Sequence, residues 1–232
     1  MWLSKDDIFE LSCALSGTSH GEFIRMLEPA VQECERIYLA PLTIHAERDA
    51  KEVVRHLCDG SWGVRLGERL MPGVCTAIAE VLMNACMHAD ADGRVVFVGE
   101  YRDRERVFNV SVYDGGVGFC GKIAEYLGRP DLTALESIDW ALKEGNSVDK
   151  EERAAGVGLN EAVDFIRRNG GLMEIVTGDV IWRIESGVVS KCPLPYAIVG
   201  SLVNFSIKMD DTVSYRKRMD AIIPENGLEI RK

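Results

Sequence analysis

Three polar residues in the segment from Pro72 to Asp90 have the types and the spacing for a ligand site: Glu80, Asn84 and His88 recur at steps of four. If the segment is a helix, that spacing places a carboxylate, an amide and an imidazole along one side. The same spacing also occurs on solvated helix faces. This segment alone therefore leaves both interpretations open.

Two glycine clusters further along the chain suit the binding of an anionic ligand. They are Asp114-Gly-Gly-Val-Gly118 and Gly156-Val-Gly158. Glycine lets the backbone approach a ligand and turn where a Cβ would clash, and Gly-x-Gly at a helix start directs free N–H groups toward an anion. Because β-turns use the same residues, one cluster alone is weak evidence for an anion-binding site. A dinucleotide-binding fold fits poorly, since no G-x-G-x-x-G opens a βαβ unit.

Taken together, the motifs resemble those of a known family. Glu80-x-x-x-Asn84-Ala85-x-x-His88, Asp114-Gly-Gly-x-Gly118 and Gly156-x-Gly158-Leu159 follow one another in the order and spacing of the N-box, G1 and G2 motifs of the GHKL ATP-binding superfamily. That group includes DNA gyrase, heat-shock chaperones, histidine kinases and MutL. The Gly200-Ser201-Leu202-Val203 run is similar to the G-T element that follows G2. The resemblance covers residues 36 to 210 and implies a GHKL-type fold.

The resemblance implies roles for the base and the metal. Asp114 would accept a hydrogen bond from the adenine amino group, because a carboxylate is an acceptor only. Gly116 and Gly118 would leave room for the base. Asn84 would bind Mg²⁺ through its amide oxygen, and the metal would bridge phosphate oxygens.

The resemblance also implies a phosphate site and a mobile segment beside it. Backbone N–H groups of Gly156, Val157 and Gly158 would face the phosphates. Leu159, Ser201 and His88 complete the implied ATP-binding residues. The chain between G1 and G2 would act as a lid over the ligand.

The glutamate at position 80 is informative about activity, because groups within this superfamily differ at this position. Histidine kinases usually carry Asn at this position, whereas gyrase, MutL and the anti-sigma serine kinases carry Glu, placed to deprotonate the attacking water or hydroxyl. Two function classes stay open. One is an enzyme that hydrolyses ATP or transfers its γ-phosphoryl group to a protein partner. The other is a nucleotide-gated switch that binds a partner with little or no turnover. Many GHKL proteins act as dimers, so a homodimer is compatible with the resemblance.

The surrounding pattern predicts an α+β sandwich with helices on one face. The resemblance implies that this is a GHKL-type two-layer sandwich with a mixed, mostly antiparallel sheet. Helices are expected over 46–58, 72–90, 135–143 and 159–168, and strands over 36–40, 94–98, 107–112, 172–177, 180–184 and 202–209. The first strand is expected to stop at Pro41. We divide the chain into a helical extension (1–35), an ATP-binding domain (36–210) and a tail (211–232).

The composition of the chain argues against several classes of function and of cellular location. The chain has 232 residues, 47% of them hydrophobic, and a formal net charge of −10, which opposes sequence-independent binding to nucleic acid. Its seven cysteines form no C-x-x-C pair, so we expect neither zinc nor a disulfide framework, and we expect Cys58 and Cys75 to be unpaired core residues. No signal peptide and no membrane-spanning run is predicted. These features predict a cytoplasmic protein.

Overall fold

The computed structural model describes residues 36–62, 67, 69–88, 95–102, 105–148 and 158–209. The predicted N-terminal extension and C-terminal tail lie outside these residues. In chain order the elements are β1 (Arg36–Ile44), α3 (Glu47–Cys58), α4 (Met71–His88), β2 (Val95–Arg102), β3 (Val107–Asp114), α5 (Gly118–Leu127), α6 (Ala134–Ala141), α7 (Leu159–Asn169), β4 (Leu172–Glu185) and β5 (Val188–Lys208).

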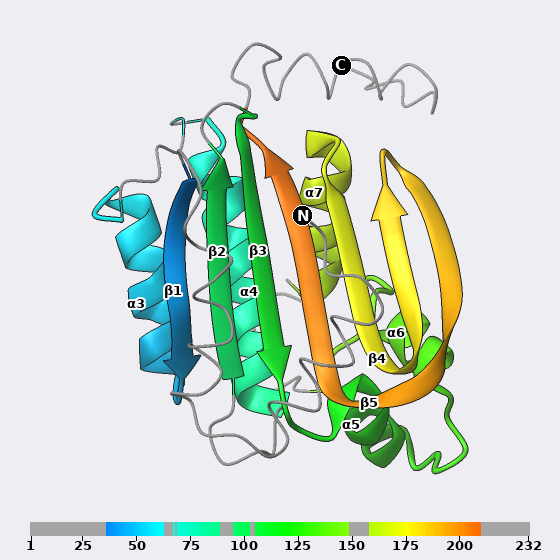
Figure 1. Ribbon diagram of the computed structural model, residues 1–232. Coiled ribbons are helices and arrows are strands. Elements are labelled where there is room, and N and C mark those ends of the chain that lie inside the picture. Colours follow the sequence, from blue (N-terminus) through cyan, green and yellow to red (C-terminus); the bar gives the residue numbers. More distant parts are fainter. Residues whose placement is uncertain are drawn as a thin grey trace, which may run out of the picture.

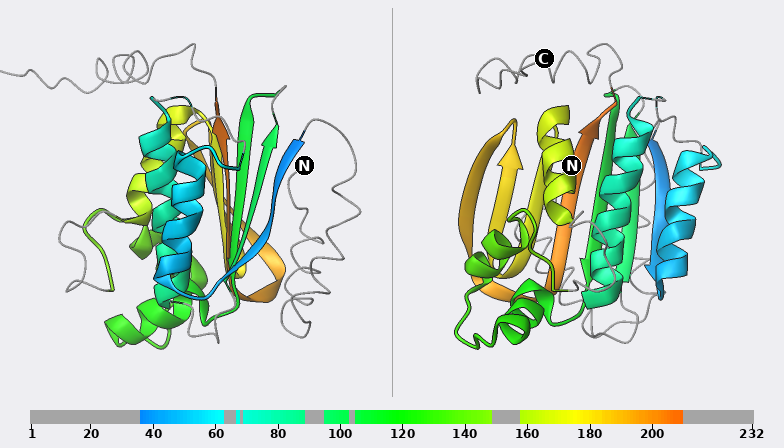
Figure 2. Two further views of the ribbon diagram at one scale, coloured as in Figure 1. Left: turned by 90° about the vertical axis from the view of Figure 1, so that its left-hand side faces the viewer. Right: turned by 180° about the vertical axis from the view of Figure 1, so that it is seen from behind.

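The strands form one five-stranded sheet in the order β1-β2-β3-β5-β4 (Figure 1). Every pairing between described strands is antiparallel, where the sequence predicted a mostly antiparallel sheet. The helices α3, α4 and α7 cover one face of this sheet, and α5 and α6 lie at one end (Figure 2). The fold is therefore the α+β two-layer sandwich that the sequence predicts.

Helix α4 is the central helix of the helical layer. Its predicted apolar stripe of Ile78, Val81, Leu82 and Ala85 is buried in the core against the sheet. Burying a side chain such as Ile78 or Leu82 contributes about 1.5–3 kcal/mol. A Cβ on Gly73 would overlap the Phe165 ring of α7, so the start of α4 packs closely on that neighbouring helix.

The β2–β3 hairpin forms as predicted, and its register is continuous from Val95 opposite Asp114 to Arg102 opposite Val107. Burial alternates along most of β3, as expected for a strand with one face against the helices. This register brings Asp114 to the end of a central strand, beside the start of α5.

Strand β1 does not stop at Pro41, as we had predicted, but continues to Ile44. Its register against β2 shifts between Leu39 and Leu42. Proline lacks the N–H that a ladder requires, but it is tolerated at an irregularity in an edge strand. Because β1 pairs with β2 alone among the described strands, the shift at Pro41 leaves the rest of the pairing intact.

The predicted strands 172–177 and 180–184 are two halves of β4, which changes direction at Gly178. The second half returns beside the first: the Ser186 N–H donates to the Gly171 carbonyl oxygen (3.5 Å), and Arg183 forms an ion pair with Glu174 (3.6 Å). The first part of β5, which we did not predict as a strand, pairs with this returning half (Figure 1).

Helix α5 was not predicted either. It contains Gly121 in its interior, where glycine costs about 1 kcal/mol relative to alanine. Tertiary packing offsets that cost, because Ile123 is 4% exposed. Gly128 then ends the helix in the left-handed conformation.

Candidate functional site

A pocket of about 870 Å³, including the solvent at its mouth, opens at the end of the sheet near the start of α5. Its lining comes from six helices or strands and from the segments beside them: Val81, Asn84 and Ala85 of α4; Val112 and Asp114 of β3; Gly118, Lys122 and Ile123 of α5; Trp140 and Ala141 of α6; Asn146, Ser147 and Val148; Gly158 and, in α7, Leu159; and Ser201 and Val203 of β5.

Residues that are distant in the sequence meet in this pocket. Six of the predicted site residues line it: Asn84, Asp114, Gly118, Gly158, Leu159 and Ser201. Gly116 and Glu80 are half-buried and do not line the pocket. The predictions for Gly156, Val157 and the His88 side chain concern groups outside the described part of the chain.

Helix α4 presents Asn84 to the pocket because the buried residues on either side fix the rotation of the helix. The Asn84 side chain is half-buried. Among the described residues no hydrogen-bond partner is present for its amide. A half-buried amide without a protein partner is open to a ligand that supplies one.

On the sheet side, Asp114 belongs to a row of three polar residues on adjacent strands. Ser201 of β5 lies opposite Asp114 of β3, and Thr177 of β4 lies opposite Ser201. The Thr177 hydroxyl donates to the Gly200 carbonyl oxygen (3.1 Å), and the Ser201 Oγ is 3.4 Å from the Thr177 Oγ1. Thr177 is 1% exposed and Ser201 3% exposed, so the row is part of the protein interior.

The Asp114 carboxylate is held in place by its own turn. The Gly116 N–H donates to its Oδ1 (3.1 Å), which is the structural role of Gly116 here. Burial raises the pKa of Asp114 from 3.8 to about 6, and hydrogen bonds from Gly116 and Ser201 oppose that rise. At neutral pH the group is therefore mostly an ionised acceptor, and a carboxylate has more acceptor positions than these bonds use.

Gly118, which lines the pocket, packs closely against the backbone of Gly200. Gly118 has a φ of +69°, and an added Cβ would lie 2.7 Å from the Thr177 Oγ1 and 2.9 Å from the Gly200 carbonyl oxygen. At Gly200, with φ +78°, an added Cβ would overlap the Asp114 carbonyl oxygen. Both positions require glycine for the fold itself.

Gly158 at the start of α7 differs from these two glycines. Its φ of −152° is ordinary extended backbone, and an added Cβ would make only an ordinary 3.6 Å contact with the Asn160 Oδ1. No side chain caps the helix here. The first N–H groups of a helix have no acceptor within it, and Gly158 and Leu159 bring this helix end to the pocket.

The wall formed by α5 and α6 was missed at the sequence level. Lys122, Ile123, Trp140 and Ala141 come from a segment that we expected to act as a lid. The start of α6 did carry a signal, because Thr133 and Glu136 form a reciprocal capping box. Nothing in the local pattern marked Lys122 or Trp140 as pocket residues.

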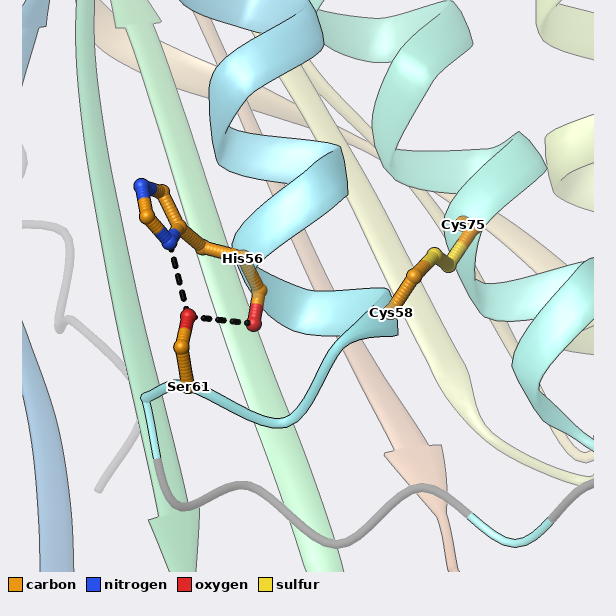
Figure 3. The surroundings of a disulfide bond; sticks show 4 residues. All are labelled: His56, Cys58, Ser61 and Cys75. Atoms are coloured by element: carbon orange, nitrogen blue, oxygen red, sulfur yellow. Dashed lines mark hydrogen bonds between the residues drawn. A yellow bond between two sulfur atoms is a disulfide. The ribbon is translucent and has the colours of Figure 1, made fainter.

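The structure also contains a cysteine pairing that we had not predicted. Cys58 at the end of α3 and Cys75 of α4 form a disulfide, although we had predicted them to be unpaired (Figure 3). Helix packing brings the pair together, which spacing alone does not reveal. Beside it, the His56 Nδ1 lies 2.7 Å from the Ser61 Oγ. Cys120, beside the first glycine cluster, is unpaired and donates to the Leu132 carbonyl oxygen (2.8 Å).

Two classes of feature are not found in the described residues. No group of three or more His, Cys, Asp or Glu side chains in this part of the chain is placed to hold a metal ion. A Mg²⁺ held by one amide oxygen, phosphate oxygens and water does not need such a group. Within the same residues, no helix is long and apolar enough to cross a lipid bilayer.

No protein-family model matches the chain, and no curated protein matches it. Conclusions about function therefore depend on the motifs and on the geometry of the pocket.

Proposed function

We propose that this chain is a GHKL-type domain that binds ATP with Mg²⁺ in the pocket. The observation that carries the proposal is the meeting of Asn84, Asp114 and Gly158 in one pocket, although they come from three separate motifs. A solvated helix face or an isolated β-turn gives no reason for these residues to converge.

Each group has a chemical task in this proposal. The Asp114 carboxylate accepts from the adenine amino group, and the half-buried position of the carboxylate makes that bond stronger than it would be in water. Asn84 offers its amide oxygen to Mg²⁺, which supplies charge neutralisation for the phosphates. The free N–H groups at the start of α7 face the phosphate end of the ligand.

Glu80 is the general base in the enzymatic form of the proposal. It lies one turn before Asn84 on α4 and takes the proton of a water, or of a hydroxyl on a protein partner, as the γ-phosphorus is attacked. The products are ADP and either free phosphate or a phosphorylated partner. The proposed location is the cytoplasm, where ATP and Mg²⁺ are available.

A second candidate function has an observation of its own. Glu80 does not line the pocket, whereas Asn84 does. A protein that binds ATP without a base at the γ-phosphate would act as a nucleotide-gated switch for a partner. Neither form of the proposal includes a nucleic-acid or membrane partner.

Glu80→Gln separates the two forms, because glutamine keeps the size of the side chain but cannot take the proton. If Glu80 is the base, γ-labelled ATP should bind within a few-fold of wild type while phosphoryl transfer falls by about 10²–10⁴-fold. The assay follows free phosphate and labelled protein, with and without candidate partners. Turnover that survives Glu80→Gln would remove the role of Glu80. A wild-type protein that binds ATP without turnover would establish the switch.

A further inference from the structure

The α5–α6 wall of the pocket is not explained by the motifs that support the proposed function. It contributes an aromatic side chain, Trp140, to a pocket whose other apolar lining is aliphatic. Trp140 is half-buried. The other two tryptophans of the described residues are engaged elsewhere: Trp62 stacks on His56 with ring centroids 5.2 Å apart, and Trp182 is 5% exposed in the core.

Helix α6 is firmly anchored in the protein. Ile138 is fully buried, and the Lys191 Nζ of β5 lies 2.8 Å from both Asp139 carboxylate oxygens. The capping box of Thr133 and Glu136 fixes the start of the helix. The backbone that carries Trp140 is thus set by contacts on several sides.

The indole itself is also oriented before any ligand arrives. Its ring lies 5.7 Å from the Tyr126 ring of α5 at an interplanar angle of 52°, a tilted arrangement that aromatic pairs favour. The Asn146 Nδ2 donates to the Trp140 carbonyl oxygen (3.0 Å), which joins the end of α6 to the next pocket-lining segment. A preorganised aromatic side chain loses little further freedom when a ligand binds.

We propose that Trp140 is a specificity-determining residue whose indole stacks against the purine base of the bound nucleotide. A planar base offers a π-face to the indole, and Asp114 on the sheet side accepts a hydrogen bond from its edge. The wall therefore favours ligands with an aromatic base over phosphate compounds without one. This inference rests on the proposed nucleotide function.

The test compares Trp140→Leu and Trp140→Phe with Trp182→Phe as the matched control. Leucine keeps much of the apolar volume but has no π-face, so ATP should bind about 5- to 150-fold more weakly by calorimetry. Phenylalanine should retain more affinity than leucine. Trp182→Phe should leave ATP affinity unchanged, because Trp182 does not line the pocket.

Tryptophan fluorescence gives a readout that a purely structural role would not change. Saturating ATP should quench the emission of the wild type and of Trp182→Phe, and that quenching should disappear in Trp140→Phe. ATP affinity of Trp140→Leu within twofold of wild type, or quenching that survives in Trp140→Phe, would overturn the inference while leaving the proposed function standing. A wild type that binds no ATP would overturn both.

Discussion

The two sides of the pocket are held in different ways. On the sheet side, Asp114, Ser201 and Thr177 form a buried row, and Gly118 fits against the backbone of Gly200. On the helix side, among the described residues, the Asn84 amide has no hydrogen-bond partner, and Gly158 would accept a Cβ without a clash.

This comparison distinguishes residue types that the fold requires from residue types that it does not require. On the sheet side the fold itself explains why the residues are glycine or small and polar. On the helix side the described contacts do not require Asn84 or Gly158, and the proposed nucleotide would give a reason for these residue types. Substitutions on the sheet side should change stability, alone or together with binding, whereas those on the helix side should change binding alone.

The largest expected effect is that of Gly118→Ala. An L-residue in the left-handed region costs about 1–2 kcal/mol, and the contacts that the Cβ would make with Thr177 and Gly200 add to that. We expect a loss of about 2–4 kcal/mol in the free energy of unfolding, measured by urea denaturation.

Gly158→Ala is the matched control on the helix side. It should leave the free energy of unfolding within about 0.5 kcal/mol of wild type. ATP binding should nevertheless weaken, because the Cβ would narrow the approach to the start of α7. Equal destabilisation by the two substitutions would contradict the distinction between the two sides.

Asp114→Asn should stabilise the protein without ligand at neutral pH and above. The folded pKa of about 6 exceeds the unfolded value of 3.8, so the folded state binds the proton more tightly. Stability from this group is present below pH 3.8 and is lost as pH rises through 6, by up to about 3 kcal/mol. Thermal unfolding should show the Asp114→Asn variant gaining stability relative to wild type between about pH 4 and pH 7. A constant difference across that range would exclude a raised pKa.

A smaller effect is expected from Asn84→Ala, and it concerns binding. Because the described residues include no partner for the amide, the melting temperature should hardly change. If the amide oxygen binds Mg²⁺, ATP affinity should fall about tenfold or more in magnesium buffer, roughly 1.4 kcal/mol, and much less in EDTA. Equal losses in both buffers would assign Asn84 to the ligand itself or to the helix.

Much of the fold could be predicted because its signals are local. The apolar stripe of α4 and the alternation along β3 indicate burial directly. By contrast, α5 contains two glycines and forms through packing of Ile123, and the first part of β5 is exposed at Val188 and Val189 and pairs only once β4 has turned back. Such tertiary effects leave no pattern in the sequence.

The same distinction between local sequence patterns and tertiary packing applies to the residues of the candidate site. Asn84, Asp114 and Gly158 were identified because they belong to spaced motifs. Trp140 and Lys122 were missed because they reach the pocket only through the way α5 and α6 pack. The Cys58–Cys75 bond was missed for a similar reason, since it depends on the contact between α3 and α4.

The most direct test of the central claim is calorimetric titration of wild-type protein with ATP and with GTP in magnesium buffer, repeated with Asp114→Asn. If Asp114 accepts from the adenine amino group, ATP should bind with an affinity that GTP does not match, because guanine presents a carbonyl where adenine has the amino donor. Asp114→Asn should weaken ATP binding by about 1–3 kcal/mol. Equal affinities for ATP and GTP, or no binding of either, would contradict the assignment of this pocket as an adenine-nucleotide site.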